Sequence, residues 1–169
     1  MTPSAIAARW AVGLASVLVM QIGVASQVRP LGIVPDLMVV ISVCAGLAGG
    51  SQRGAVVGFW AGFLYDLPRD HPLGLSALAY CLIAFAAGML QEVVLQTGRA
   101  VSTVLVAVGS AAAVLLFAAL GEMFGAHTIE RTNLVLLLVV VALVAALMSR
   151  IGLRLASWAD GPESRSMAE

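Results

Sequence analysis

Four acidic residues stand where the apolar stretches of this chain begin or end, and they are the side chains best suited to chemistry. They are Asp36, Asp66, Glu92 and Glu122. Proton relays and ion-coupled pumps require titratable groups inside the membrane. The middle of every apolar stretch lacks Asp, Glu, His, Lys and Arg. The sequence therefore predicts that the chain carries no proton or ion relay.

The densest group of ionisable residues lies between Asp66 and His71 and includes Asp70. A loop that keeps polar residues at the water boundary explains this group, so we expect no metal and no other cofactor. The chain also lacks an H-E-x-x-H motif, a phosphate-binding glycine loop and a G-x-S-x-G elbow. We therefore predict that it is not an enzyme. An enzyme acting on lipid-linked substrates stays as an alternative, if Asp36, Asp66 and Glu122 converge on a shared cavity.

The composition is that of a chain whose solvent is the lipid bilayer. Of its 169 residues, 61% are hydrophobic and 11% are charged, whereas charged residues make up about a quarter of an ordinary soluble domain. All nine basic residues are arginines, and they form no basic patch, so nucleic acid is not an expected partner. Cys44 and Cys81 lie inside apolar runs and predict neither a disulfide nor a metal site.

Six apolar segments predict an all-α fold, a polytopic membrane protein with six transmembrane helices. We expect one membrane domain over residues 1–157 and a polar cytoplasmic tail over 158–169. A helix needs about 20 residues to cross a 30 Å hydrocarbon core, so the second and third segments are short for a span. Gly49, Gly50 and Ser51 predict a tight turn between them, and one long kinked helix is the alternative. The predicted segments are residues 10–28, 36–50, 54–67, 73–92, 101–123 and 133–151.

The arginines predict the orientation of these helices. If the N-terminus lies inside, six arginines lie on the inner side, among them Arg9, Arg53 and Arg99, and three lie on the outer side. Because positive residues are enriched in cytoplasmic loops, we expect a multi-pass protein of the bacterial plasma membrane with both termini in the cytoplasm. Arg53, in the turn between the second and third segments, would be an interfacial charge that sets this orientation.

The glycines of the third segment recur at a helical spacing. Gly54, Gly58 and Gly62 are four residues apart, and Asp66 is the next residue in the same register. Glycines at this spacing line one face of a helix and allow another backbone to approach closely. We predict that this face packs against a helix of the same chain or of a partner. Asp66 would then link the third and fourth helices by accepting backbone N–H groups, and Asp36 would have a similar interfacial role.

Taken together, these residues resemble the rod shape-determining protein MreD family. The resemblance rests on Pro35-Asp36, on "RGAVVGFWAGFLYD" from Arg53 to Asp66, and on "PLGLSALAY" from Pro72 to Tyr80. It covers about residues 34–88, and the first helix and the last two match only as apolar segments.

The resemblance implies a non-catalytic component of the bacterial cell-elongation complex, which helps to position peptidoglycan synthesis. The implied partners are MreC and, through it, MreB, RodA and penicillin-binding protein 2. Whether the chain also pairs with itself as a homodimer is left open.

The family is also similar in its six-helix layout to the substrate-binding membrane subunits of vitamin transporters of the energy-coupling-factor type. This supplies an alternative function. Ala7, Ala11 and Ala15 have the spacing with which those subunits dock their transport partner, although spacing of this kind is common in an alanine-rich segment. A vitamin site would draw on Trp60, Tyr65, Asp66, Arg69 and Asp70, the densest group of polar and aromatic residues.

Overall fold

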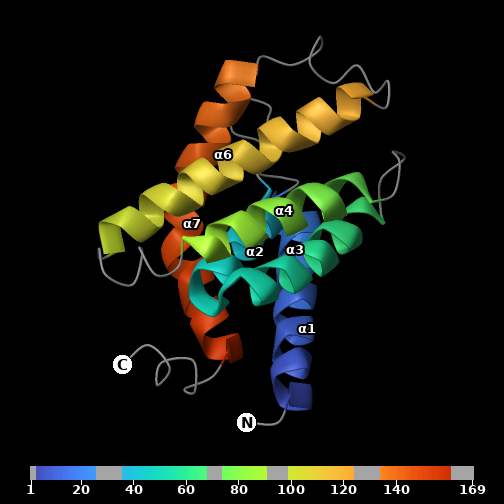
Figure 1. The fold of residues 1–169 in the computed structure, drawn as a ribbon, viewed down its shortest axis with the longest axis vertical. Coiled ribbons are helices and arrows are strands. Elements are labelled where there is room, and N and C mark those ends of the chain that lie inside the picture. Colours follow the sequence, from blue (N-terminus) through green and yellow to red (C-terminus); the bar gives the residue numbers. More distant parts are fainter. Residues whose placement is uncertain (1–2, 26–35, 68–73, 91–98, 124–133, 161–169) are drawn as a thin grey trace.

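The computed structural model describes residues 3–25, 36–67, 74–90, 99–123 and 134–160, and these residues are helical apart from short turns (Figure 1). The prediction of an all-α fold is confirmed. The helices are α1 (Pro3–Met20), continued by the π-helical turn η1 (Gln21–Ala25), then α2 (Leu37–Gly49), α3 (Ser51–Asp66), α4 (Leu75–Met89), α6 (Arg99–Met123) and α7 (Leu134–Asp160).

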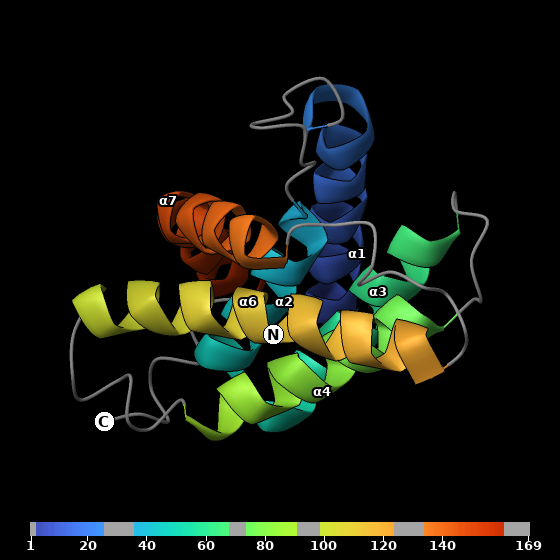
Figure 2. The same cartoon turned by 90° about the horizontal axis from the view of Figure 1, so that it is seen from above.

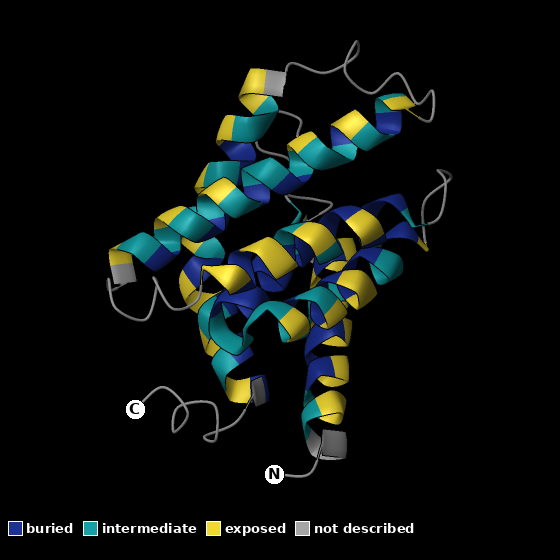
Figure 3. Ribbon diagram, in the orientation of Figure 1, coloured by how far each residue is buried: buried dark blue, intermediate teal, exposed yellow. Residues whose placement is uncertain are grey.

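Helix α2 is the centre of the bundle. Each of its residues from Met38 to Leu47 is buried, and it contacts every other described helix. Figure 3 shows the contrast with the outer helices, on which buried and exposed residues alternate along the ribbon. A helix that is apolar on every side is suited to a core position or to a membrane span, and α2 lies in the core of the bundle.

Helices α3 and α4 form a closely packed pair beside α2 (Figures 1 and 2). The chain passes from α2 into α3 through Gly50, whose φ of 83° is one that a residue with a side chain rarely adopts. Its N–H donates to the Gly46 carbonyl at 2.9 Å and so closes the last turn of α2. The turn predicted at Gly49–Ser51 therefore joins two separate helices.

Helix α6 lies across the bundle and packs against α2, α4 and α7 (Figure 2). Within the described residues, three stretches are long and apolar enough to cross a membrane: Ile6–Gly23, Ala100–Met123 and Val135–Ala159. Helices α2 and α4 are apolar but shorter. The 13 residues of α2 extend about 20 Å, less than the 30 Å of a typical hydrocarbon core.

Two helix boundaries, the start of α1 and the end of α7, differ from the predicted segments by more than five residues. Helix α1 begins at Pro3 rather than near Trp10, because proline is well suited to the first turn of a helix. Helix α7 continues past Ile151 to Asp160 and so enters the range predicted as a polar tail. Its last turns still bury Ala156 and Ala159, and the sequence offers no Gly-Pro stop before residues 161 and 162.

The described surface is apolar and part of the interior is polar, the reverse of a soluble protein. Leu147 on α7 is 73% exposed and Val19 on α1 is 71% exposed. Ser42, Ser110 and Ser149 are instead buried inside the bundle. In a bilayer, burying leucine between helices gives no hydrophobic gain, because lipid is equally apolar, and helices pack through small residues instead. The exposed large apolar residues and buried serines of this bundle agree with that pattern.

Candidate functional site

The first part of the candidate site is the glycine face of α3, which lies against the backbone of α4. A Cβ atom added at Gly58 would lie 2.6 Å from the Tyr80 carbonyl oxygen, and one at Gly54 would lie 2.5 Å from the Ala84 carbonyl oxygen. At Gly62 it would lie 2.5 Å from the Ala77 Cα atom. Each distance is too short for a real Cβ atom. The close approach of α3 and α4 therefore requires glycine along this face.

Asp66 ends α3 and is fully buried. Its Oδ2 atom accepts hydrogen bonds from the Gly74 N–H at 2.8 Å and the Ser76 N–H at 3.2 Å. These amide groups belong to the first turn of α4, whose N–H groups have no partner within the helix. A single carboxylate oxygen thus joins the end of one helix to the start of the next. Residues 68–73, which connect the two helices, lie outside the described residues.

Asp36 caps the central helix α2. Its Oδ1 atom accepts from the Met38 N–H at 2.9 Å and from the Val39 N–H at 3.3 Å. The Leu37 N–H donates instead to the Gln21 side-chain oxygen at 2.8 Å, which brings the π-helical end of the first helix to the same place. Because the first N–H groups of a helix need outside acceptors, these two side chains stabilise the start of α2.

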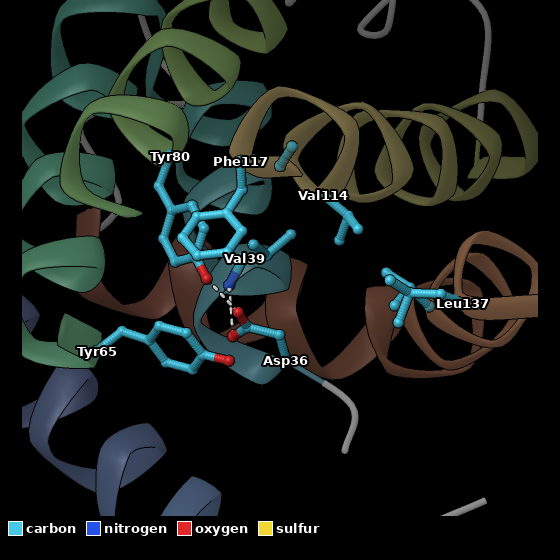
Figure 4. Close-up of a pocket in the computed structure, with 9 residues that line it drawn as sticks. Asp36, Val39, Tyr65, Tyr80, Val114, Phe117 and Leu137 are labelled. Carbon is cyan, nitrogen blue, oxygen red and sulfur yellow. Dashed lines mark hydrogen bonds between the residues drawn. The ribbon is translucent and has the colours of Figure 1, made fainter. Parts of the chain in front are cut away.

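The two tyrosines of the chain converge on Asp36 from different helices. The Tyr80 hydroxyl, on α4, donates to the Asp36 Oδ2 atom. The Tyr65 hydroxyl, at the end of α3, points toward the same carboxylate (Figure 4). The rings are 5.8 Å apart between centroids and tilted by 48°. Three consecutive helices, α2, α3 and α4, thus meet at one acid.

This cluster forms the polar end of a cavity of about 150 Å³. Its remaining walls are apolar and come from α2, α6 and α7, where Val114 and Leu137 face the acid across the cavity (Figure 4). The lining residues are Asp36, Val39, Tyr65, Tyr80, Ala113, Val114, Phe117, Leu137 and Val141.

The other residues singled out in the sequence lie elsewhere or outside the described part of the chain. Arg53 is half-buried in the first turn of α3, at the opposite end of that helix from Asp66. Trp60 is 52% exposed and stacks edge-on with Phe63 on the outer face of α3. Arg69, Asp70 and His71 lie outside the described residues, so the vitamin-site group stays a prediction.

No group of three His, Cys, Asp or Glu residues that could hold a metal ion occurs among the described residues. Ala7, Ala11 and Ala15 of α1 are exposed.

Sequence reasoning missed the two tyrosines as partners of Asp36. The signal available was their number, since Tyr65 and Tyr80 are the only tyrosines of the chain. Nothing in their spacing places them together, because the convergence depends on how α3 and α4 pack beside α2.

A family model described as rod shape-determining protein MreD matches residues 6–151, nearly the whole chain. No curated protein and no solved structure matches the chain.

Proposed function

The chain belongs to the MreD family of rod shape-determining membrane proteins, and from this membership we propose that it is a non-catalytic scaffold of the bacterial cell-elongation complex. The observation that carries the proposal is the extent of the match, which runs from the first helix into the last. Membrane location and cell-shape determination follow from the family. The partners, the orientation and the number of spans do not follow from the family match and are proposed below.

The chemistry of the buried acids supports a scaffold. Asp66 is engaged by two backbone N–H groups, and Asp36 by two backbone N–H groups and the Tyr80 hydroxyl. Hydrogen bonds of this kind fix helix ends in place. The two carboxylates are thus engaged in positioning α2, α3 and α4 relative to one another.

We propose six membrane spans with both termini in the cytoplasm, a layout similar to that of the substrate-binding subunits of energy-coupling-factor transporters. The described ends of α1 and α7 are held together, which supports the placement of both termini on one side. The Arg9 guanidinium donates to the Trp158 carbonyl at 3.3 Å and lies 5.4 Å from the Trp158 ring centroid. Helices α2, α3 and α4 would span by local thinning of the bilayer.

We propose that the direct partner is MreC, with MreB, RodA and penicillin-binding protein 2 reached through it. The apolar outer faces of α1, α3, α6 and α7 offer surface to a partner's membrane helix as well as to lipid. In this proposal the glycine face of α3 acts indirectly, because it is covered by α4 and keeps the α2–α3–α4 group rigid.

The test is purification of the tagged protein from its native membrane in mild detergent, followed by identification of the proteins that accompany it. Recovery of MreC supports the proposal, and recovery with RodA and penicillin-binding protein 2 extends it. Recovery of an ATP-hydrolysing energising module, with no elongation protein, would instead favour the alternative of a vitamin-transporter subunit.

A further inference from the structure

We propose that the cavity beside Asp36 binds a small organic cation, a primary ammonium or guanidinium group on a short apolar stem. This site is separate from the scaffold function. The polar end of the cavity, its apolar walls and its place in the bundle each support the proposal.

The polar end of the cavity offers hydrogen-bond acceptors. The Tyr80 hydroxyl has its proton directed to the Asp36 carboxylate, and the Tyr65 hydroxyl points to the same group (Figure 4). A phenol that donates its one proton keeps its oxygen lone pairs as acceptors. None of the nine lining residues is basic. A ligand that donates hydrogen bonds complements this end, and a positively charged donor would also pair with the acid.

The walls of the cavity select for an apolar stem and add to the attraction for a cation. Val39, Val114, Leu137 and Val141 line it together with the ring of Phe117. Aromatic faces attract cations, most strongly where the pair is removed from water. The cavity volume of about 150 Å³ is close to that of an engineered apolar cavity of about 150 Å³ that holds benzene. A head group of similar size with part of its stem therefore fits.

The cavity lies toward one end of the bundle. It is lined from the start of α2, the end of α3, the first half of α4, the second half of α6 and the start of α7. This end is opposite the α2–α3 turn. An amphiphile at the interface can thus place its cationic group on the acid and its stem between α6 and α7. The two sources of such a group are a free amine and the head group of an aminophospholipid.

The two tyrosines make a direct test simple, because both line the cavity and the chain has no other. Protein labelled with 3-fluorotyrosine gives two ¹⁹F resonances, which Tyr65→Phe and Tyr80→Phe assign. The full chain in detergent is titrated with hexylammonium and, separately, with hexanol, a neutral ligand of nearly the same shape. We expect hexylammonium to shift both resonances in a saturable way and hexanol to act at least tenfold more weakly. Equal shifts with both ligands, or no shift with either, would overturn the proposal.

Asp36→Asn is the matched variant, because asparagine caps a helix about as well as aspartate. It keeps an acceptor for the Met38 and Val39 N–H groups but removes the negative charge. We expect the variant to stay folded with a lower melting temperature, because the Tyr80 hydroxyl loses its carboxylate acceptor. We expect its affinity for hexylammonium to fall at least tenfold. Wild-type affinity in the folded variant would overturn the proposal.

A second pair of samples distinguishes the two sources of the cation. The labelled protein is placed in nanodiscs of phosphatidylglycerol alone or of phosphatidylglycerol mixed with phosphatidylethanolamine. Shifted resonances in the mixed nanodiscs, with weakened hexylammonium binding, assign the site to the lipid head group. Unchanged resonances with full hexylammonium binding assign it to free amines.

Discussion

Asp66 joins the end of α3 to the start of α4 through two backbone amide groups. Because the residue is fully buried, its removal leaves these amide groups without their acceptor. An unsatisfied buried hydrogen-bonding group costs about 1–3 kcal/mol. We therefore expect Asp66→Ala to lower the free energy of unfolding in mixed detergent micelles by about 2–5 kcal/mol.

The matched variant at this position is Asp66→Asn, which retains one side-chain oxygen as an acceptor. We expect it to lose about 1 kcal/mol, the value of a typical hydrogen bond weakened by loss of charge. If the alanine and asparagine variants unfolded alike, and both close to the wild type, Asp66 would not be the link between the two helices.

At the residue scale, the sequence predicted which residues share a helix face better than it predicted which side chains form hydrogen bonds with one another. The register of Gly54, Gly58, Gly62 and Asp66 follows from the helical period alone, and a donor for Asp66 at the start of the next helix follows from the short connection. The tyrosines around Asp36 could not be predicted, because their meeting depends on the packing of three helices. The functional roles of Asp36, Arg53 and Asp66 stay predictions.

Helices α3 and α4 approach closely enough that a single methyl group on the glycine face would strike backbone. At Gly58 a Cβ atom would lie 2.6 Å from the Tyr80 carbonyl oxygen and 2.9 Å from its carbonyl carbon. Backbone cannot move aside as a flexible side chain can, and overpacking of this kind costs about 1–3 kcal/mol. We expect Gly58→Ala to destabilise the protein by about that amount in a detergent unfolding assay.

Gly13 on α1 provides the control for this variant. A Cβ atom there meets the Leu155 Cδ2 atom at an ordinary 3.8 Å and nothing closer. Alanine favours a helix over glycine by about 1 kcal/mol, so Gly13→Ala should leave the protein equally stable or slightly more stable. A loss of stability as large at Gly13 as at Gly58 would refute the close-packing explanation.

At the element scale, the apolar segments of the sequence predicted helices but not where they end. Apolar runs show where lipid or core contacts are needed, whereas a helix continues into polar sequence until a stop signal appears. Helix α7 therefore extends beyond Ile151 to Asp160. The π-helical turn at Gln21–Ala25 was also not predicted, because the period of the apolar residues does not reveal it.

The whole molecule is a bundle in which the start of α1 and the end of α7 lie on the same side. Arg9 and Trp158 hold the start of α1 against the end of α7, and the excess of inner arginines predicts that this side faces the cytoplasm. We expect a green fluorescent protein fused after residue 169 to fluoresce and an alkaline phosphatase fused there to be inactive. An active phosphatase at that position would reverse the orientation.

The family and the membrane class could be predicted from the sequence, because they depend on composition and on the local pattern from Pro35 to Tyr80. The number of spans could not, because α2 and α4 are too short for length alone to decide. The cavity beside Asp36 depends on five helices at once, and no local pattern encodes it.

The central claim is that this chain supports rod shape as a rigid scaffold, and cell shape under replacement tests it most directly. The resident protein is depleted in the bacterium that encodes it, while wild type, Gly58→Ala or Gly13→Ala is supplied at matched levels. The length-to-width ratio of the cells is then measured. We predict rods with the wild type and Gly13→Ala, and rounded cells with no supplied copy and with Gly58→Ala. Cells that stay rod-shaped after full depletion would contradict the account.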